Sequence, residues 1–411
     1  MKHDDHILVF NSGSSSLKFQ LGADTPDSTL RGVVRDLGDE AVCEWIYHGQ
    51  RERVSVTAND HGSAARYVLT LLNQITDAGG SLLDTVTAIG HRIVHGGESF
   101  FEPTLLTNKA LAALDAMSPL APLHNPPALA VIRACQEERP DLPQVGVFDT
   151  AFFHALPDYV RAYALPAEWT EQSQPIRRYG FHGLAHRCMV ERFATIHAAN
   201  DTSTRVITLQ LGHGCSVAAI RNGEAIETSM GFTPLEGLIM ATRPGDLDAG
   251  VLLHLLERGV VSITELNDAL NHRSGLLGLS GVSGNMQELL ELEAQGHAGA
   301  HLAVEAFCHR ARKYLGAYLA VLGGADAIAF GGGIGEHAAA IRARICAGMA
   351  WCGLQLDEQS NHSVEGAEAC ISAADAAIAA YVIPVDEELL IARDTVNCLS
   401  TTHAQDSRYS N

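Results

Sequence analysis

Two short stretches of the chain are rich in small residues, which lets a backbone approach phosphate oxygens closely. The run Asn11-Ser12-Gly13-Ser14-Ser15-Ser16 is followed closely by Lys18. Small residues leave backbone N–H groups open to an anion. The alternative is a solvated Ser/Gly turn, because the run is not a Walker sequence. Residues 331–335, after an apolar stretch, allow the same two interpretations.

Two arginines lie in glycine-rich, loop-like settings. Arg92 belongs to residues 90–97, and Arg243 belongs to residues 241–246. The planar guanidinium binds a carboxylate or a phosphate through two parallel hydrogen bonds. Each arginine is therefore a candidate anion-binding group, and a surface ion pair is the alternative for each.

Three histidines have suggestive positions. His182 and His186 are four residues apart, which on a helix could hold zinc. The glutamate of the zinc-protease motif is replaced by Gly183, which also weakens a helix, so zinc is disfavoured. His124 directly precedes Asn125-Pro126-Pro127, where a helix N-terminus would attract an anion.

The candidate acids follow apolar runs. Asp149 ends the strand-like residues 145–148, and open α/β sheets bind ligands at the carboxyl ends of their strands. Glu387 and Glu388 follow a second apolar run. A carboxylate near a phosphate loop suits Mg²⁺, which takes one or two protein oxygens plus phosphate and water. A solvated surface group is the alternative for each acid.

The elements that would position these residues follow an α/β pattern of short apolar runs between amphipathic stretches. Residues 7–10 and 17–21 predict a hairpin around the first turn. Residues 205–211 and 216–220 predict another around Gly212-His213-Gly214. Two such hairpins about 200 residues apart indicate a duplicated domain.

Periodicity predicts two helices and a strand. Apolar residues at three- and four-residue spacing predict a helix through residues 304–322 that ends at Gly323-Gly324. Residues 325–330 predict the strand that follows it. A further helix is predicted from residue 126 onward, with Asn125 as its cap and proline in its first turn.

Composition limits the classes of partner. The 411 residues carry a formal charge of −20, which argues against a nucleic-acid or anionic-membrane partner. Nine cysteines without CxxC spacing predict reduced thiols in a cytoplasmic protein. The N-terminal apolar run is too short for a signal peptide, and no stretch approaches the ~20 apolar residues of a membrane span.

Taken together and in order, these segments resemble the acetate kinase pattern across almost the whole chain. The matching segments are Asn11-Ser12-Gly13-Ser14-Ser15-Ser16-Leu17-Lys18-Phe19, residues 90–97, 124–127, 148–152, 177–183, 228–237, 333–336 and 387–389. The resemblance implies two duplicated, ribonuclease-H-like α/β lobes of the actin and sugar-kinase superfamily, with the active site in the cleft between them. It also implies a homodimer.

The resemblance further implies domain boundaries and an activity. The first lobe would comprise residues 1–152 and 388–411, and the nucleotide-binding second lobe residues 153–387. The implied activity is Mg²⁺-dependent, reversible transfer of a phosphoryl group from ATP to acetate, giving acetyl phosphate and ADP by direct in-line attack. Mn²⁺ is an alternative ion.

Residue roles are also implied by the resemblance. The metal site would use Asn11 and Glu387, and the catalytic residues would be Asp149, His182, Arg243 and His124. Arg92 would bind the acetate carboxylate, and Val94, Leu123, Phe181 and Pro234 would surround its methyl group. The nucleotide site would comprise Lys18, Gln210, Leu211, Gly212, His213, Gly214, Asn285, Met286, Gln287, Gly333, Ile334, Gly335, Glu336 and His337.

The chain departs from the family pattern mainly on the nucleotide side. His213 and His337 replace asparagines, and Gln210 replaces a histidine. Asn285 and Gln287 replace an acid and an arginine of the base-binding segment. The phosphoryl donor is therefore left open. Propionate or butyrate kinase, a nucleotide-binding sensor of the same fold, and a zinc hydrolase using His182 and His186 are the alternatives.

Overall fold

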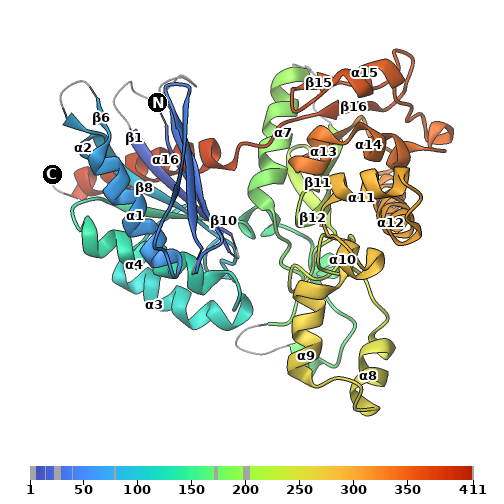
Figure 1. The fold of residues 1–411 in the computed structure, drawn as a ribbon, viewed down its shortest axis with the longest axis horizontal. Helices are drawn as coiled ribbons and strands as arrows, with labels where there is room; N and C mark the ends of the chain where they lie inside the picture. The colour runs from blue at the N-terminus through green and yellow to red at the C-terminus, as the bar shows by residue number, and fades with distance from the viewer. Residues whose placement is uncertain are drawn as a thin grey trace. The chain divides into compact units, whose positions relative to one another are not determined.

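The chain folds into two α/β units (Figure 1). The computed structural model describes residues 6–13, 15–22, 29–38, 40–77, 80–170, 175–197 and 204–409, with side chains as far as residue 401. The first unit comprises Met1–Ala151 and Asp386–Asn411, and the second comprises Phe152–Val385. The predicted α/β class is confirmed by the two mixed sheets, one in each unit.

The first unit is a large sheet with helices. Its strands are β1 (His6–Ser12), β2 (Leu17–Leu21), β3 (Leu30–Arg35), β4 (Val42–Tyr47), β5 (Gln50–Ser55), β6 (Thr76–Asp77), β7 (Gly80–Ser81), β8 (Val86–Ile93), β9 (Thr104–Leu105) and β10 (Gln144–Phe148). Its helices are α1 (His61–Gln74), α2 (Leu82–Thr85), α3 (Asn108–Met117), α4 (Asn125–Glu138) and α16 (Glu387–Tyr409).

The main sheet of this unit has the order β5-β4-β3-β2-β1-β8-β10-β9. Strands β1 to β5 form an antiparallel meander, whereas β1, β8 and β10 are parallel. The carboxyl ends of these three parallel strands therefore meet at one edge of the sheet.

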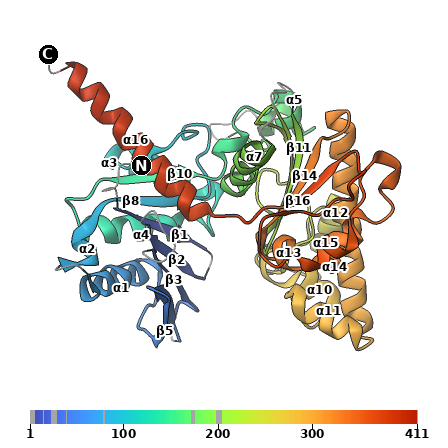
Figure 2. The same ribbon diagram turned by 90° about the horizontal axis from the view of Figure 1, so that it is seen from above.

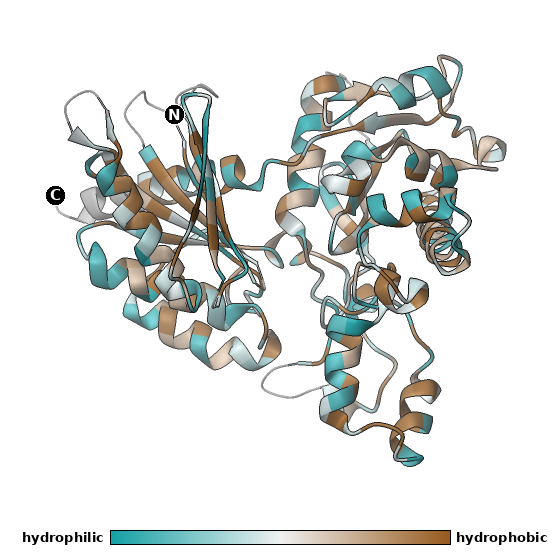
Figure 3. Cartoon of the chain, in the orientation of Figure 1, coloured by the Kyte–Doolittle hydropathy of each residue, from teal (hydrophilic) through white to brown (hydrophobic). Residues whose placement is uncertain are grey.

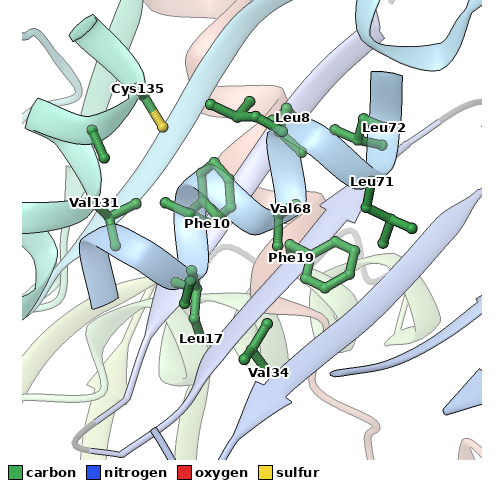
Figure 4. Close-up of a cluster of buried hydrophobic side chains, with 14 of the residues drawn as sticks. Leu8, Phe10, Leu17, Phe19, Val34, Val68, Leu71, Leu72, Val131 and Cys135 are labelled. Atoms are coloured by element: carbon green, nitrogen blue, oxygen red, sulfur yellow. The ribbon is translucent and has the colours of Figure 1, made fainter. Parts of the chain in front are cut away.

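Strand β1 lies between α16 on one side and α1 and α4 on the other (Figure 2), and alternate residues of a strand face opposite sides of the sheet. Leu8 and Phe10 join a buried cluster with Val68 of α1 and Val131 of α4 (Figure 4). Asn11, one residue further along, instead hydrogen-bonds Glu387 of α16. The face of Leu8 and Phe10 thus holds the sheet to α1 and α4, and on the opposite face Asn11 bonds the first turn of α16.

The second unit contains the remaining elements. Its strands are β11 (Arg205–Leu211), β12 (Cys215–Arg221), β13 (Glu224–Thr228), β14 (Ala327–Gly331), β15 (Ala369–Cys370) and β16 (Ala379–Val382). Its helices are α5 (Asp158–Arg161), α6 (Ala167–Thr170), α7 (Gly183–His197), α8 (Ala249–Glu257), α9 (Ile263–Asp268), α10 (Gly275–Ser280), α11 (Met286–Ala294), α12 (Ala298–Leu322), α13 (Gly332–His337), α14 (Ala339–Cys346) and α15 (Glu358–Ser363).

The second sheet repeats the topology of the first, which confirms the predicted duplication. Its order is β13-β12-β11-β14-β16-β15. β11, β12 and β13 form an antiparallel meander, and β11, β14 and β16 are parallel. Both sheets also end in a short antiparallel edge strand, β9 or β15.

Most of the elements predicted from the sequence are present, with three corrections. Both predicted hairpins form, and α12 ends at Gly323 in the left-handed conformation at φ 71°. The strand predicted at 325–330 is β14, which begins two residues later. The glycine-rich segment after it is not a loop, because α13 begins there.

The third correction concerns the start of α4. Asn125 was expected to cap this helix, but the cap position belongs to His124, which makes no capping bond with its side chain. The amide of Asn125 is buried and bonds both backbone polar groups of His95, at 3.1 and 3.0 Å. Asn125 therefore joins the start of α4 to the segment that follows β8.

A membrane span is not found among the helices of the described ranges, none of which is long and apolar enough.

Candidate active-site residues

Arg92 lies at the carboxyl end of β8, between the neighbouring strands β1 and β10. Its partners across the sheet are Asn11 on β1 and Val147 on β10. Its Nε and Nη2 donate to the two carboxylate oxygens of Asp149 at 3.1 and 2.5 Å, and its Nη1 donates to Asn11 Oδ1 at 2.9 Å. Asp149 is fully buried. Its carboxylate therefore fixes the orientation of the guanidinium.

The electrostatic surroundings keep Arg92 charged. Burial of the guanidinium lowers its pKa, but the carboxylates of Asp149, Glu387 and Glu388 outweigh burial and raise the pKa overall. A guanidinium has five N–H donors. Within the described chain three of them have acceptors, so two can bind an additional anion.

Two carboxylates converge beside Arg92 at the start of α16. Asn11 Nδ2 donates to Glu387 Oε2 and to Glu388 Oε1, each at 2.9 Å. Two carboxylate oxygens held on one amide match the hard oxygen donors that Mg²⁺ takes. The oxygen of Asn11 faces Arg92, so here Asn11 orients the acids rather than presenting its own oxygen. Glu388, which the resemblance did not include in the metal site, shares the amide of Asn11 with Glu387.

The first hairpin carries the predicted phosphate turn. Gly13 N donates to Ser16 O at 2.8 Å, which closes the turn, and His61 Nε2 contacts Gly13 O at 2.8 Å. Lys18 is exposed and lies directly opposite Asn11 across the hairpin. Ser14 lies outside the described residues. An exposed lysine beside this turn suits an anionic ligand.

The residues predicted to surround a methyl group divide between the two units. Val94, buried after β8, and Leu123, which is exposed, belong to the first unit, as does the half-buried His124. Phe181, which is buried, and Pro234 belong to the second unit.

His182 and His186 are joined through a hydroxyl. Ser216 Oγ lies 2.9 Å from His182 Nδ1 and 2.8 Å from His186 Nε2. The other nitrogen of His186, Nδ1, lies 2.6 Å from Thr208 Oγ1. Both ring nitrogens of His186 are thus engaged by hydroxyls, which excludes the zinc pair considered from the sequence.

Arg243 and His182 meet at the turn of the second hairpin. A Cβ placed on Gly214 would lie 2.8 Å from Arg243 Nη2 and 3.0 Å from His182 Nε2. A side chain on residue 214 would therefore displace the ends of both groups. Arg243 Nη1 donates to Pro234 O at 2.8 Å. Burial lowers the pKa of Arg243. The two side-chain nitrogens at Gly214 form a candidate site for a phosphoryl group.

Acidic residues outside the predicted set brace the segment that carries Arg243. Glu236 accepts hydrogen bonds from Tyr163 Oη at 2.5 Å and from Arg178 Nη2 at 2.6 Å. Asp246 accepts from Gly237 N at 2.9 Å. The sequence indicates Glu236 and Arg178 only as parts of matching segments. The hydrogen bond between them joins positions 58 residues apart, so no local pattern predicts it.

A pocket of about 1060 Å³ opens beside this turn, within the second unit. Its walls combine apolar side chains with a few polar ones, as small-molecule sites do. Among the lining residues are the predicted Gly212, His213, Asn285, Met286, Gln287, Gly333, Ile334 and His337, with Thr242, Leu290 and Glu291 in addition. Glu291 is the only acid in the lining, which contains no Lys or Arg.

Asn285 has a structural role that the sequence did not indicate. Its side-chain oxygen caps α11, accepting from Gln287 N at 2.9 Å and from Glu288 N at 3.4 Å. Gln287 is exposed on α11, with Nε2 3.4 Å from Glu291 Oε1. Its amide and the Glu291 carboxylate are therefore better placed than Asn285 to meet a base.

The glycine-rich segment approaches β11 closely. Gly332 has φ 75°, and a Cβ there would lie 2.7 Å from Leu211 O and 2.9 Å from Gln210 Nε2. The carboxylate of Glu336 accepts from Gly332 N at 2.9 Å and from Val385 N at 3.1 Å. Of the predicted nucleotide residues, Glu336 thus holds residues 331–335 in place through hydrogen bonds. Gln210 and Leu211 lie against Gly332 of this segment.

The fold and these groups define a protein of two duplicated α/β units. One unit carries an arginine among carboxylates, and the other carries an arginine and a histidine beside a pocket of about 1060 Å³. Residues 6–393 match the model of the Acetokinase family. The chain belongs to this family, so the resemblance to acetate kinases is confirmed.

Individual relatives match over nearly their whole length. The acetate kinase of Solibacter usitatus is 46% identical over 407 residues, covering 96% of this chain and 98% of that protein. The acetate kinase of Bacteroides thetaiotaomicron is 42% identical over 400 residues, covering 96% and 99%.

Solved structures match equally widely. The crystal structure of acetate kinase from Porphyromonas gingivalis superposes with a TM-score of 0.88 at 38% identity, covering 96% of this chain and 100% of that chain. A propionate kinase from Francisella tularensis superposes with a TM-score of 0.87 at 36% identity, covering 95% and 98%.

Proposed function

We propose that this protein is an acetate kinase that transfers a phosphoryl group reversibly between ATP and acetate, forming acetyl phosphate and ADP. One observation carries the proposal beyond family membership. His182 Nε2 and Arg243 Nη2 converge at Gly214, and a pocket of about 1060 Å³ lies next to this turn. A nucleoside in the pocket would direct its phosphates toward these two nitrogens.

Arg92 is the proposed acetate-binding group. Asp149 and Asn11 occupy three of its N–H donors, and the two that remain suit a carboxylate. Asp149 has both oxygens on the guanidinium, so it orients Arg92 and does not act as a proton acceptor. Acetate needs no base, because a carboxyl group with a pKa near 4 is already ionised at neutral pH.

The chemical problem is then repulsion between two anions rather than proton removal. An acetate oxygen attacks the γ-phosphorus in line, the bond from phosphorus to the bridging oxygen breaks, and ADP leaves with that oxygen. Arg243 and His182, with His124 in the proposed set, stabilise charge on the transferring group.

Mg²⁺ would be held by Glu387 and Glu388, with Asn11 orienting both carboxylates. Bound there, the ion would neutralise charge on the nucleotide phosphates. Lys18, on the neighbouring strand, supplies the exposed cation of the same region.

A coupled chemical assay tests the activity. Purified protein with acetate, ATP, Mg²⁺ and hydroxylamine should yield acetyl hydroxamate, and acetyl phosphate with ADP should yield ATP. Protein that binds nucleotide but forms no acyl phosphate in either direction would instead be a nucleotide-binding sensor.

The acyl substrate is open to one close alternative, because a propionate kinase superposes as well as an acetate kinase. One methylene group discriminates by only ~1–3 kcal/mol. Competition between acetate and propionate at equal concentration gives the ratio of kcat/KM values directly. Preference for propionate would reassign the substrate and leave the reaction class unchanged.

We also propose a homodimer that packs through α8 and α9. These helices contain no buried residue, and they expose Leu253 at 58% and Ile263 at 77%. Much of α8 has the brown colour of hydrophobic residues in Figure 3. Exposed apolar clusters mark interaction surfaces. Light scattering should give twice the chain mass, and Leu253→Glu should give monomers. Trp351→Glu, at an exposed position on another element, is the control.

The cytoplasm is the proposed compartment. All nine cysteines are free, and most of them are buried. Free thiols in this number suit a reducing compartment. Fractionation of the native host with an antibody against the chain tests this.

A further inference from the structure

Four side chains, connected by hydrogen bonds, form a line from the second sheet to His182. Thr208 on β11 contacts His186 on α7 at 2.6 Å, His186 contacts Ser216 on β12 at 2.8 Å, and Ser216 contacts His182 at 2.9 Å. Thr208, His186 and Ser216 are fully buried. The active-site role proposed for His182 does not by itself explain why this line is present.

The protonation of His186 follows from its surroundings. Burial lowers the pKa of His186 to about 3, so its ring is neutral at physiological pH. A neutral imidazole has one N–H donor and one bare nitrogen acceptor. One of its two hydroxyl partners must therefore donate to it, and the other must accept from it.

Thr208 determines which partner donates. Its hydroxyl has no other hydrogen bond among the residues that the structure describes, and it is fully buried. A buried O–H left without an acceptor costs about 1–3 kcal/mol, whereas an unused lone pair costs less. Thr208 therefore donates to His186 Nδ1, and the proton of His186 is on Nε2.

The donor and acceptor roles of Ser216 and His182 follow from the proton position on His186. His186 Nε2–H donates to Ser216 Oγ. The buried Ser216 hydroxyl has no other acceptor among the described residues, so it donates to His182 Nδ1. We propose that Thr208, His186 and Ser216 are positioning residues that hold His182 in the tautomer with its proton on Nε2. Nε2 is the nitrogen that lies beside Gly214 and Arg243 Nη2.

The catalytic consequence rests on the proposed phosphoryl transfer. His182 presents an N–H donor, rather than a lone pair, next to the guanidinium of Arg243. A phosphoryl oxygen would thus meet two donors without a second fixed cation repelling Arg243. The backbone supports a constrained position, because His182 has φ 59°, a left-handed conformation that costs a non-glycine residue energy.

The test is a direct measurement of the tautomer. Protein carrying ¹⁵N in its histidine rings should show His182 with a protonated Nε2 and an unprotonated, hydrogen-bonded Nδ1. The His182 signals are identified by their loss in His182→Gln. A proton on Nδ1 of His182 in the unchanged protein would overturn the proposal. Because this readout needs no turnover, it separates failure of the proposal from failure of the proposed activity.

Variants of Thr208 provide the second arm. Thr208→Val keeps the shape but removes the donor, and the loss of one hydrogen bond of about 1 kcal/mol should shift the His182 tautomer ratio about fivefold. Thr208→Ser should restore the original ratio. Thr395→Val, which removes another buried threonine hydroxyl, controls for general effects of this change. An unchanged ratio in Thr208→Val contradicts the assigned direction.

The kcat of the proposed reaction should depend on the tautomer of His182. Ser216→Ala should lower kcat about tenfold or more and leave the KM for acetate within about twofold, because its partner His182 acts on the phosphoryl group. Equal changes in both parameters, with an unchanged ¹⁵N signature of His182, would indicate a role in packing alone.

Discussion

Asp149 binds Arg92 with both of its carboxylate oxygens, at 2.5 and 3.1 Å, while remaining fully buried itself. A buried carboxylate is costly unless it is paired and hydrogen-bonded. The same pair occurs on the surface of the same unit, where Arg139 binds both oxygens of Asp141 at 3.0 and 2.7 Å. The two pairs differ mainly in burial, so they form a matched comparison.

Asp149→Asn should lower kcat/KM for acetate about a hundredfold, because a misplaced binding group can cost that factor. The amide keeps the shape but replaces one acceptor oxygen with a donor that faces a guanidinium. Asp141→Asn should change activity little, since exposed pairs contribute only ~0–1 kcal/mol. Rates come from the hydroxamate assay. Equal activities of the two variants would show that Asp149 does not orient Arg92.

Replacing the two arginines should separate binding from chemistry. Arg92→Ala should mainly raise the KM for acetate, because its open donors suit the substrate carboxylate. Arg243→Ala should mainly lower kcat, by roughly a hundredfold or more, because its partner is the transferring group. Steady-state kinetics with acetate as the varied substrate distinguish the two. Near-normal kcat/KM in both variants would show that neither role is assigned correctly.

Local patterns predicted the duplication, both hairpins and α12, because each depends on residues close together in the chain. Asn125 shows the limit of such patterns. It stands where a cap is expected, yet its amide bonds His95, 30 residues earlier. A cap position gives no sign of such a distant partner.

The same limit applies at the site. The candidate residues were found by residue type and setting, but their partners come from other strands. Ser216 is an ordinary strand serine in the sequence, and only the pairing of β11 with β12 places it between His182 and His186. Asn285 was considered as a reader of the base, whereas its oxygen is used by α11.

The protein should discriminate only weakly between ATP and GTP. The pocket lining has no cation to stack on a base, and amide and carboxylate groups accept several base edges. We expect GTP to be used within about tenfold of ATP, equivalent to ~1.4 kcal/mol. Comparing kcat/KM for the two triphosphates measures this. Discrimination of a hundredfold or more would point to a specific base contact.

Asn285→Ala should raise the KM for ATP and GTP by a similar factor, because the change removes a helix cap worth about 1 kcal/mol rather than a base contact. Thr107→Ala, which removes the cap of α3 in the other unit, should leave both values unchanged. A change in the ATP to GTP ratio would mean that Asn285 does read the base.

Acid should destabilise the first unit through His91. This histidine is buried, and burial lowers its pKa to about 4 from an ordinary value near 6.5. The folded state favours the neutral ring, so this stability is full above pH 6.5 and is lost as pH falls toward 4. The loss is about 3 kcal/mol at pH 4. Urea midpoints against pH measure it, and His91→Gln should flatten the fall after normalisation at pH 8.

His213 should contact the nucleotide as a neutral ring. The ring keeps an exposed part in the pocket wall, yet burial and then the charge of Arg243 lower its pKa. A histidine with a lowered pKa is already uncharged at pH 7, and deprotonation at higher pH changes nothing further.

Titration of His213 should therefore not change the KM for ATP between about pH 7 and 9. His213→Asn, which replaces one neutral hydrogen-bonding group with another, should give a parallel profile at fixed Mg²⁺. A bound phosphate acts in the opposite direction, because an adjacent anion favours the protonated ring. If that attraction outweighed burial and Arg243, the KM for ATP of the unchanged protein would climb with pH. The climb would disappear in His213→Asn while the KM for acetate remained level in both.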